Sequence, residues 1–214
     1  MRLFFAVVCA LFLCCCVQQS EEIRQLSGVE VREYQGERLS SVADFRENSI
    51  SGPQHVNITD YRLQITGLVE EPRSFSYEQV LDHQRYRKVV LLHCVEGWSV
   101  NLLWDGVLVK DLLDEAGVRP EANTVIFYAV DGYSTSFPLD YVRDRNILLA
   151  YGMNNVTLPA ERGYPFELVA EDKWGYKWIK WVERIELSND SAYRGYWERQ
   201  GYSNGGDLGS RFLE

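Results

Sequence analysis

Hydrophobic residues fall into several short runs along the chain, and their periods are those of β-strands. In one run Tyr61, Leu63 and Ile65 alternate with polar neighbours, the pattern of a half-buried strand. Two other runs, RKVVLLHC and NTVIFYAV, place apolar residues on consecutive positions, which is typical of strands buried on both faces. The predicted strands are completed by FELVAED and by WIKWVERIEL, the latter with Ile179, Trp181, Ile185 and Leu187 on one face.

Two segments between these runs carry helical signals. Ser76 and Gln79 can form a capping box, which predicts a short helix through Leu81. In VLVKDLLDEAG the apolar residues recur at helical spacing until Gly117, a residue type favoured just after a helix end. Several strands with few, interspersed helices indicate a mixed α+β domain.

The first sixteen residues differ from the rest and predict export. Arg2 precedes an apolar run of about a dozen residues, the length of a signal-peptide core and too short to span a bilayer comfortably. Leu13, two small residues and Cys16 resemble a bacterial lipobox, in which the cysteine is lipidated and becomes the new N-terminus. A plain signal peptide or an uncleaved anchor is the alternative, because cysteines are unusual at a cleavage site. We therefore expect an extracytoplasmic protein, periplasmic or at the cell surface, attached to the membrane through a lipid anchor.

The composition after this segment is that of a globular protein. Residues 17–41 are polar and low in aromatic residues, which predicts a tether or an extended arm before a domain at residues 42–214. The whole chain is 46% hydrophobic and 25% charged, as expected for one soluble domain. Its net charge of −9 argues against binding to nucleic acid, whose phosphates require a basic surface. Any basic site must therefore be local.

Cysteine usage singles out Cys94. The other four of the five cysteines lie in the first sixteen residues, so removal of a signal peptide leaves no partner for an intramolecular disulfide. A cysteine after an apolar strand is most often a small buried hydrophobic residue. A nucleophile would need a base, but His93 points to the opposite strand face, and neither His55 nor His83 lies in a recognisable motif. A zinc site needs four clustered ligands, which one cysteine and three scattered histidines do not provide. The third functional interpretation is a single soft thiolate ligand to a metal that an organic cofactor holds.

The segment HCVEGWS (93–99) resembles the metal-binding loop of the sulfite oxidase family, the oxidoreductases with a molybdopterin-binding domain. Further segments resemble the family in the same order, and together they cover roughly residues 58–190. They are YRLQITGLVEEPRSFSYEQVL, WDGVLVKDLLDEAGV, DGYSTSFPL, LLAYGMNNVTLP, RGYPFELV and WGYKWIKWVERIEL. The resemblance implies a sulfite-oxidase-type molybdopterin-binding fold of the α+β class, with mixed sheets and interspersed short helices. It extends to the periplasmic methionine sulfoxide reductases of the family.

The resemblance assigns catalytic roles to three residues. Cys94 matches the cysteine whose thiolate binds the metal, molybdenum or tungsten, beside the pterin. Glu96 resembles an acidic residue near the metal that relays protons during oxygen-atom transfer, and the alternative is an ordinary surface carboxylate. Tyr133 matches the active-site tyrosine, whose hydroxyl donates to an oxo group or to bound substrate. Without the resemblance, Tyr133 would be interpreted as a turn aromatic.

Other residues resemble those that hold the cofactor. The pterin carries a phosphate, which requires cations and backbone donors. Lys180 matches the phosphate-binding lysine of the family, and Lys177 is the second candidate because a regular strand would place it on the opposite face. Gly175 begins the turn whose backbone N–H groups can reach the cofactor. Asn48 resembles an asparagine that contacts the cofactor from the N-terminal arm, although its spacing to Cys94 is unusual.

Three departures from the family bear on function. Many relatives have an anion-binding arginine where this chain has Glu167, which favours neutral S- or N-oxides over sulfite as the substrate. Arg162 occupies the position of a histidine or asparagine in relatives and is expected to restore a cation at the phosphate. Exported relatives commonly use a twin-arginine signal, whereas Arg2 stands alone here.

We therefore expect a molybdopterin-dependent oxidoreductase that transfers an oxygen atom to or from a small-molecule substrate. Its electrons would pass through a redox partner, a membrane or soluble cytochrome. The alternative is a cofactor-free binding lipoprotein that retains the fold, favoured by the missing twin-arginine signal and the lost arginine. A cysteine-dependent hydrolase is disfavoured because no histidine base is placed beside the thiol. The aromatic residues Tyr196, Trp197 and Tyr202 are expected to cover the cofactor side or pack on the sheet.

Overall fold

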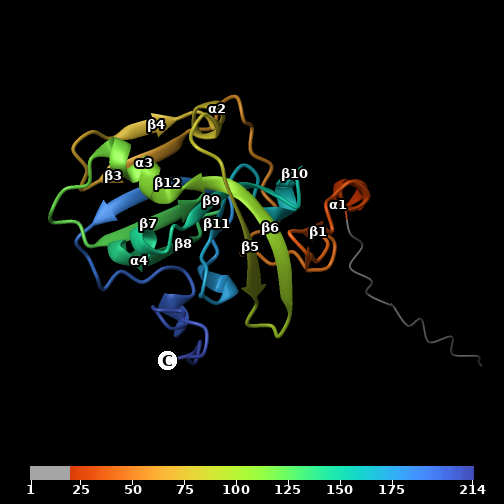
Figure 1. Ribbon diagram of the computed structural model, residues 1–214. Coiled ribbons are helices and arrows are strands. Elements are labelled where there is room, and N and C mark those ends of the chain that lie inside the picture. The colour runs from red at the N-terminus through yellow and green to blue at the C-terminus, as the bar shows by residue number, and fades with distance from the viewer. Residues whose placement is uncertain (1–19) are drawn as a thin grey trace, which may run out of the picture.

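The computed structural model describes residues 20–214, in which two five-stranded sheets are the main elements (Figure 1). The predicted signal peptide and lipobox in residues 1–16, and the start of the predicted tether, lie outside the described residues. The predicted α+β class, with mixed sheets and short helices, is confirmed. Within residues 20–214, none of the helices has the length and apolar character needed to cross a bilayer.

The first sheet carries the strand that leads to Cys94. Its strands are β5 (Tyr86–His93), β6 (Ser99–Leu108), β9 (Leu148–Met153), β10 (Val156–Thr157) and β11 (Glu167–Val169). They are antiparallel in the order β10, β9, β6, β5, and β11 pairs with β9 as well. The turn between β5 and β6 contains Cys94 and lies at the lower end of this hairpin in Figure 1.

The second sheet holds the remaining long strands. These are β3 (Leu63–Gly67), β4 (Arg73–Phe75), β7 (Thr124–Ala129), β8 (Ser134–Pro138) and β12 (Val182–Ser188). Their order is β4, β3, β12, β7, β8, and β12 runs parallel to β3 but antiparallel to β7. A separate short pair consists of β1 (Glu33–Tyr34) and β2 (Glu37–Arg38).

The helices are short and connect the strands. The α-helices are α1 (Glu21–Ser27), α2 (Tyr77–Leu81), α3 (Val109–Ala116) and α4 (Leu139–Asp144), and the 3₁₀ helices are η1 (Ala160–Arg162), η2 (Gly175–Lys177) and η3 (Glu198–Gln200). The predicted capping box of α2 is confirmed, because Ser76 and Gln79 exchange hydrogen bonds between side chain and backbone in both directions. Helix α3 ends at Gly117, as predicted, with a φ of 68° that glycine adopts at little cost.

One continuous hydrophobic core joins both sheets and α3. Large side chains such as Trp104 and Phe127 are fully buried there, and each burial of this size contributes about 1.5–3 kcal/mol. Strand β6 passes very close to β9, since a Cβ atom on Gly106 would lie only 2.4 Å from the carbonyl oxygen of Leu149. Only glycine therefore fits where β6 bends at its irregular register with β9.

Two strand predictions were wrong in part. β5 was expected to be buried on both faces, but it is the edge of its sheet and Leu91 is 44% exposed. The last strand was expected from Trp178, but β12 begins at Val182. Trp181 has a φ of 54°, which interrupts an extended backbone, so Ile179 and Trp181 do not lie on a strand face.

The described residues of the segment predicted as a tether or an arm pack on the domain. Ile23 of α1 and Leu39 are buried. The buried carboxylate of Glu30 accepts a hydrogen bond from the side-chain amide of Asn154 at 2.8 Å. A few apolar residues and the buried hydrogen bonds of Glu30 therefore hold a segment whose composition is otherwise that of a linker.

The C-terminal residues 189–214 are held by a buried ion pair. Lys177 Nζ lies 2.6 Å from Glu198 Oε1, and both side chains are fully buried. The same ammonium donates to the backbone oxygens of Ser136 and Asn204, at 2.8 and 3.0 Å. The pair thus joins η2, β8 and the terminal segment, which lies below α4 and β8 in Figure 1.

We predict that Glu198→Gln lowers the free energy of unfolding by about 3–5 kcal/mol, because it leaves the Lys177 ammonium buried without a counter-charge. Urea denaturation followed by tryptophan fluorescence measures the change. As a control, Glu214→Gln removes the exposed ion pair with Arg194 and should leave stability nearly unchanged, since water screens that pair. Equal effects of the two substitutions would contradict the role given to the buried pair.

Candidate functional site

A cavity of about 340 Å³ lies where residues 45–50, parts of both sheets and the C-terminal segment meet, and its size is in the range of small-molecule sites. The structure brings most of the sequence-predicted site residues into its wall. These are Asn48, Cys94, Glu96, Tyr133, Arg162, Gly175 and Lys180. Lys177 is the predicted residue that does not line the cavity.

Cys94 directly follows β5, as predicted, and its thiol is buried and unpaired. The side-chain amide of Asn48 lies 3.6 Å from Sγ, close enough for a weak hydrogen bond to sulfur. Burial raises the pKa of the Cys94 thiol above its ordinary value. The sulfur is therefore protonated at neutral pH until a metal or another electrophile replaces the proton.

None of the histidines, all of which the structure describes, acts as a base toward this thiol. The ring of His93 packs edge-on against Trp174, and His83 Nε2 lies 2.8 Å from Glu115. His55 lines a separate groove beside α1. Within residues 20–214 there is also no cluster of three or more histidine, cysteine, aspartate or glutamate side chains that could hold a metal ion. The geometry thus supports neither a cysteine-dependent hydrolase nor a zinc site.

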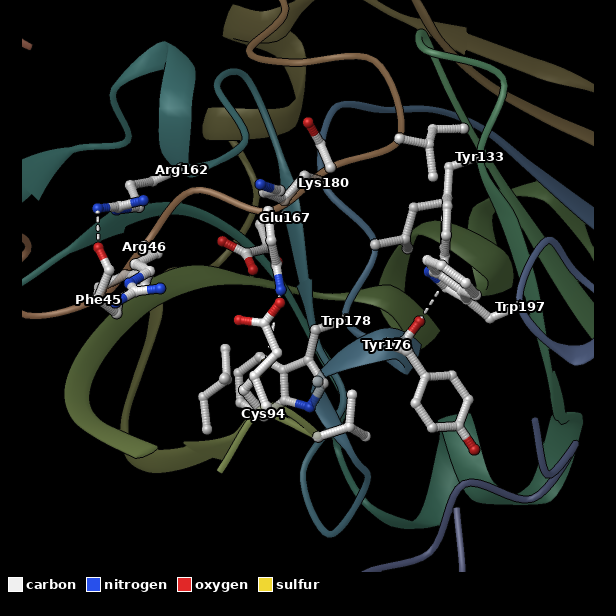
Figure 2. Close-up of a pocket in the computed structure, with 18 of the residues that line it drawn as sticks. Phe45, Arg46, Cys94, Tyr133, Arg162, Glu167, Tyr176, Trp178, Lys180 and Trp197 are labelled. Atoms are coloured by element: carbon white, nitrogen blue, oxygen red, sulfur yellow. Dashed lines mark hydrogen bonds between the residues drawn. The ribbon is translucent and has the colours of Figure 1, made fainter. Parts of the chain in front are cut away.

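Glu96 and Tyr133 both line the cavity, but they differ in how their polar atoms are hydrogen-bonded within the chain. A carboxylate oxygen of Glu96 accepts a hydrogen bond from the indole N–H of Trp98 at 3.1 Å, and its second oxygen has no hydrogen bond among the described residues. The Tyr133 hydroxyl donates to the carbonyl oxygen of Tyr176, as the dashed line in Figure 2 shows. Burial raises the pKa of Tyr133 well above its ordinary value, so this hydroxyl stays protonated.

Two cations lie together at one end of the cavity. Lys180 Nζ is 2.7 Å from Glu47 Oε1, and the guanidinium of Arg162 donates to the carbonyl oxygens of Val42 and Phe45. Arg162 therefore fixes the chain segment that carries Glu47 and Asn48. Figure 2 shows Arg162 and Lys180 at one end and Cys94 at the other.

Gly175 and Lys177 take separate positions although both belong to η2. Gly175 lies against the Cys94 loop, where a Cβ atom would come within 3.1 Å of the His93 carbonyl oxygen. The Lys177 ammonium instead turns toward Glu198. Lys177 and Lys180 therefore have different surroundings, as the opposite faces of a regular strand would also have given them, although Lys177 lies in a 3₁₀ helix instead.

Sequence reasoning noted Glu167 only as a departure and did not place it in the site. Its side chain is 5% exposed and lines the cavity from β11. Burial raises the pKa of Glu167 to about 8, although the nearby cations Lys180 and Arg162 act to lower it. A carboxyl group that is neutral at pH 7 therefore lies beside the cations.

Trp197 and Tyr202 reach the cavity from the C-terminal segment, which agrees with the first of the two alternatives given for these aromatic residues. One further part of the wall was missed. Arg46 lines the cavity, and in the described chain its guanidinium has no hydrogen bond or ion pair. The available signal was the position of Arg46, a basic residue two positions before Asn48, which had been matched to a cofactor contact.

Comparison with known proteins assigns the chain to one family. The family model described as oxidoreductase molybdopterin binding domain matches residues 50–197. The chain is 37% identical over 156 residues to the oxidoreductase YuiH of Bacillus subtilis, which covers 72% of this chain and 78% of that protein. It is 34% identical over 145 residues to the protein-methionine-sulfoxide reductase catalytic subunit MsrP of Gluconobacter oxydans, over 59% of this chain and 46% of that one.

A solved structure supports the same relationship. The crystal structure of the sulfane dehydrogenase SoxCD from Paracoccus pantotrophus superposes with a TM-score of 0.63 and 31% identity, over 65% of this chain and 41% of that one. The expected sulfite-oxidase-type fold is thereby confirmed. The chain spans less than half the length of SoxCD and of the MsrP relative.

We predict that Arg162→Lys loosens residues 42–48, because a lysine cannot hold both carbonyl groups with one planar fork. Loss of one charged hydrogen bond costs about 1.5–3 kcal/mol, which corresponds to about tenfold or more in local opening. Hydrogen–deuterium exchange of the segment measures this opening. Arg46→Lys is the matched control and should leave exchange unchanged. Weaker cofactor binding with unaltered exchange would instead favour the predicted phosphate contact of Arg162.

Proposed function

The chain belongs to the oxidoreductase molybdopterin-binding family, and from this premise we propose that its cavity binds a molybdenum pterin and removes an oxygen atom from a small S- or N-oxide. The observation that carries the proposal is the unpaired Cys94 thiol at one end of a cavity whose other end holds cations. A soft sulfur donor suits molybdenum, and cations suit the phosphate of the pterin.

The residues present fit such a cofactor. Cys94 has no disulfide partner among the described residues, so its sulfur is available to a metal, which would displace the thiol proton. Lys180 and Arg162 present positive charge to the same cavity. Because Lys180 already binds Glu47, an incoming phosphate must share or replace that carboxylate.

The chain contributes positioning and proton transfer. When bound, the molybdenum pterin supplies two-electron chemistry that moves an oxygen atom. Reduction of a sulfoxide consumes two electrons and two protons and releases a thioether and water. Glu96, held by the Trp98 indole, can exchange a proton at its second carboxylate oxygen. The Tyr133 hydroxyl is held by a backbone carbonyl, so its first role is to shape the wall beside the substrate.

The charge of the wall favours a neutral substrate. Three carboxylates in the lining would repel an anion such as sulfite. They belong to Glu96, Asp131 and Glu161, whereas Glu167 is neutral at pH 7 and repels no anion. Trp98 and Trp178 offer apolar surface for the substituents of a sulfoxide. The name of the Gluconobacter relative states methionine sulfoxide, which is a neutral oxide of this class in its side chain.

The route of electrons and the location complete the proposal. Electrons would arrive from a redox partner, a membrane or soluble cytochrome, and the protein would act outside the cytoplasm on a lipid anchor. Because the family model names molybdopterin, molybdenum is the proposed metal and tungsten has no support. The rival function is a cofactor-free binding lipoprotein. The ion pair between Lys180 and Glu47 supports it, because the lysine expected to bind the phosphate already has a carboxylate partner.

We predict about one molybdenum and one pterin per chain in protein purified from its native compartment, and a loss of molybdenum in Cys94→Ser, because the variant lacks the thiolate through which the chain would hold the metal. Metal mass spectrometry and fluorescence of the oxidised pterin measure the contents. His83→Gln removes a possible ligand outside the cavity and should retain both. Absence of molybdenum from wild type and variant alike would support the binding lipoprotein.

We predict that the loaded protein reduces methionine sulfoxide with a kcat/KM about a hundredfold or more above that for sulfite oxidation, since like charges opposed in a buried site cost several kcal/mol. A reduced viologen serves as the electron donor in one assay and ferricyanide as the acceptor in the other. Sulfite turnover without sulfoxide reduction would refute the assignment of a neutral oxide.

A further inference from the structure

Glu167 is a buried carboxyl group without a visible partner. In the described chain, no hydrogen bond or ion pair joins its carboxyl oxygens to another residue, and these oxygens are not among the fully enclosed atoms, so they are open to the cavity. The side chain comes from β11, is almost fully buried and lines the cavity. Because buried polar groups are nearly always hydrogen-bonded, a group that faces a cavity in this way points to a ligand as its partner.

The stems of Glu167 and Lys180 lie side by side. Gly163 shows this directly, because a Cβ atom built there would lie 3.0 Å from Cβ of Glu167 and 3.2 Å from Cβ and Cγ of Lys180. Gly163 has a φ of 92°, so the turn has the conformation and the space that admit both side chains. In Figure 2 both side chains lie at the end of the cavity away from Cys94.

Burial and the surrounding charges decide whether the Glu167 carboxyl group is protonated. Burial raises its pKa more than Lys180 and Arg162 lower it, and the balance is a pKa of about 8. Lys180 is shared with Glu47, and Arg162 is occupied by backbone carbonyls. The other charged groups of the wall are Arg46, Glu96, Asp131 and Glu161. At neutral pH the carboxyl group therefore carries a proton that it can donate.

We propose that Glu167 binds the phosphate of the cofactor as a neutral carboxylic acid, its O–H donating a hydrogen bond to a phosphate oxygen beside the Lys180 ammonium. The inference rests on the proposed function, because it requires the pterin in this cavity. A carboxylate at the same place would repel the phosphate, whereas the acid replaces one donor of the arginine expected there. Cofactor binding and protonation of Glu167 are thus linked.

Affinity for the cofactor is expected to fall as the pH rises through the Glu167 pKa. Only the protonated form binds, so above the pKa of about 8 each pH unit lowers the affinity for the cofactor about tenfold. Cys94 acts in the opposite sense, because its thiol must lose a proton to bind the metal. Comparison with a variant that is neutral at every pH separates the two effects.

The test compares the loaded wild type with Glu167→Gln between about pH 6.5 and pH 9.5, the range that spans this titration. Molybdenum and pterin retained after dialysis give the dissociation constant of the cofactor. The glutamine amide donates at every pH, so the ratio of the wild-type constant to that of the variant should rise about tenfold per pH unit above 8. Glu183→Gln, which removes an exposed carboxylate outside the cavity, should follow the wild type.

The outcomes separate this inference from the function on which it rests. Parallel loss of cofactor from wild type and Glu167→Gln would overturn the inference and leave molybdopterin binding in place. A wild type without molybdenum and pterin at every pH would overturn the proposed function. If the variant does not fold, ¹³C NMR of the Glu167 carboxyl in wild type decides: its pKa should rise when the cofactor is bound, and a fall would contradict the proposal.

Discussion

The site depends on one close backbone contact, the parallel β-bridge between His93 and Trp174. His93 is the last residue of β5, and Trp174 precedes η2. The bridge brings the Cys94 loop against Gly175, where a Cβ atom would lie 3.4 Å from the Cys94 Cα atom and 3.1 Å from the His93 carbonyl oxygen, so the absence of a side chain permits the close approach. It thereby joins the end of one sheet to the segment that leads to Lys180. A soft donor and a cation from distant parts of the chain face one cavity for this reason.

The charges of the cavity follow from that arrangement. Two cations of the cavity are satisfied by the chain, the partly buried Lys180 by Glu47 and the buried Arg162 by two backbone carbonyls. Glu167 is left with proximity to these cations but with no hydrogen bond from them, so the cost of desolvation prevails and the group stays neutral at pH 7. An anionic group of a ligand can therefore accept hydrogen bonds from the donors of the cavity wall. The carboxylates of the same wall repel small free anions.

Both terminal segments complete this wall. Arg162 holds residues 42–45 and with them the nearby Asn48, which reaches the Cys94 sulfur. At the other end, the buried pair of Lys177 and Glu198 fixes the segment that supplies Trp197 and Tyr202. The contact explains why Lys177, a predicted cofactor ligand, lies outside the cavity. The Lys177 ammonium pairs in the interior with Glu198 of the C-terminal segment, and this ion pair holds the segment in place.

The sequence by itself determined those features that depend on residues a few positions apart. The α2 capping box, the end of α3 at Gly117 and the position of Cys94 after β5 are of this kind, and the order of motifs identified the family. Only the tertiary structure decided that β5 is an edge strand, that Lys177 is buried and that Glu167 is neutral. The burial of a side chain and the identity of its partner depend on segments that are distant in the sequence and exclude water where they meet. The local pattern of apolar and polar residues does not predict these contacts.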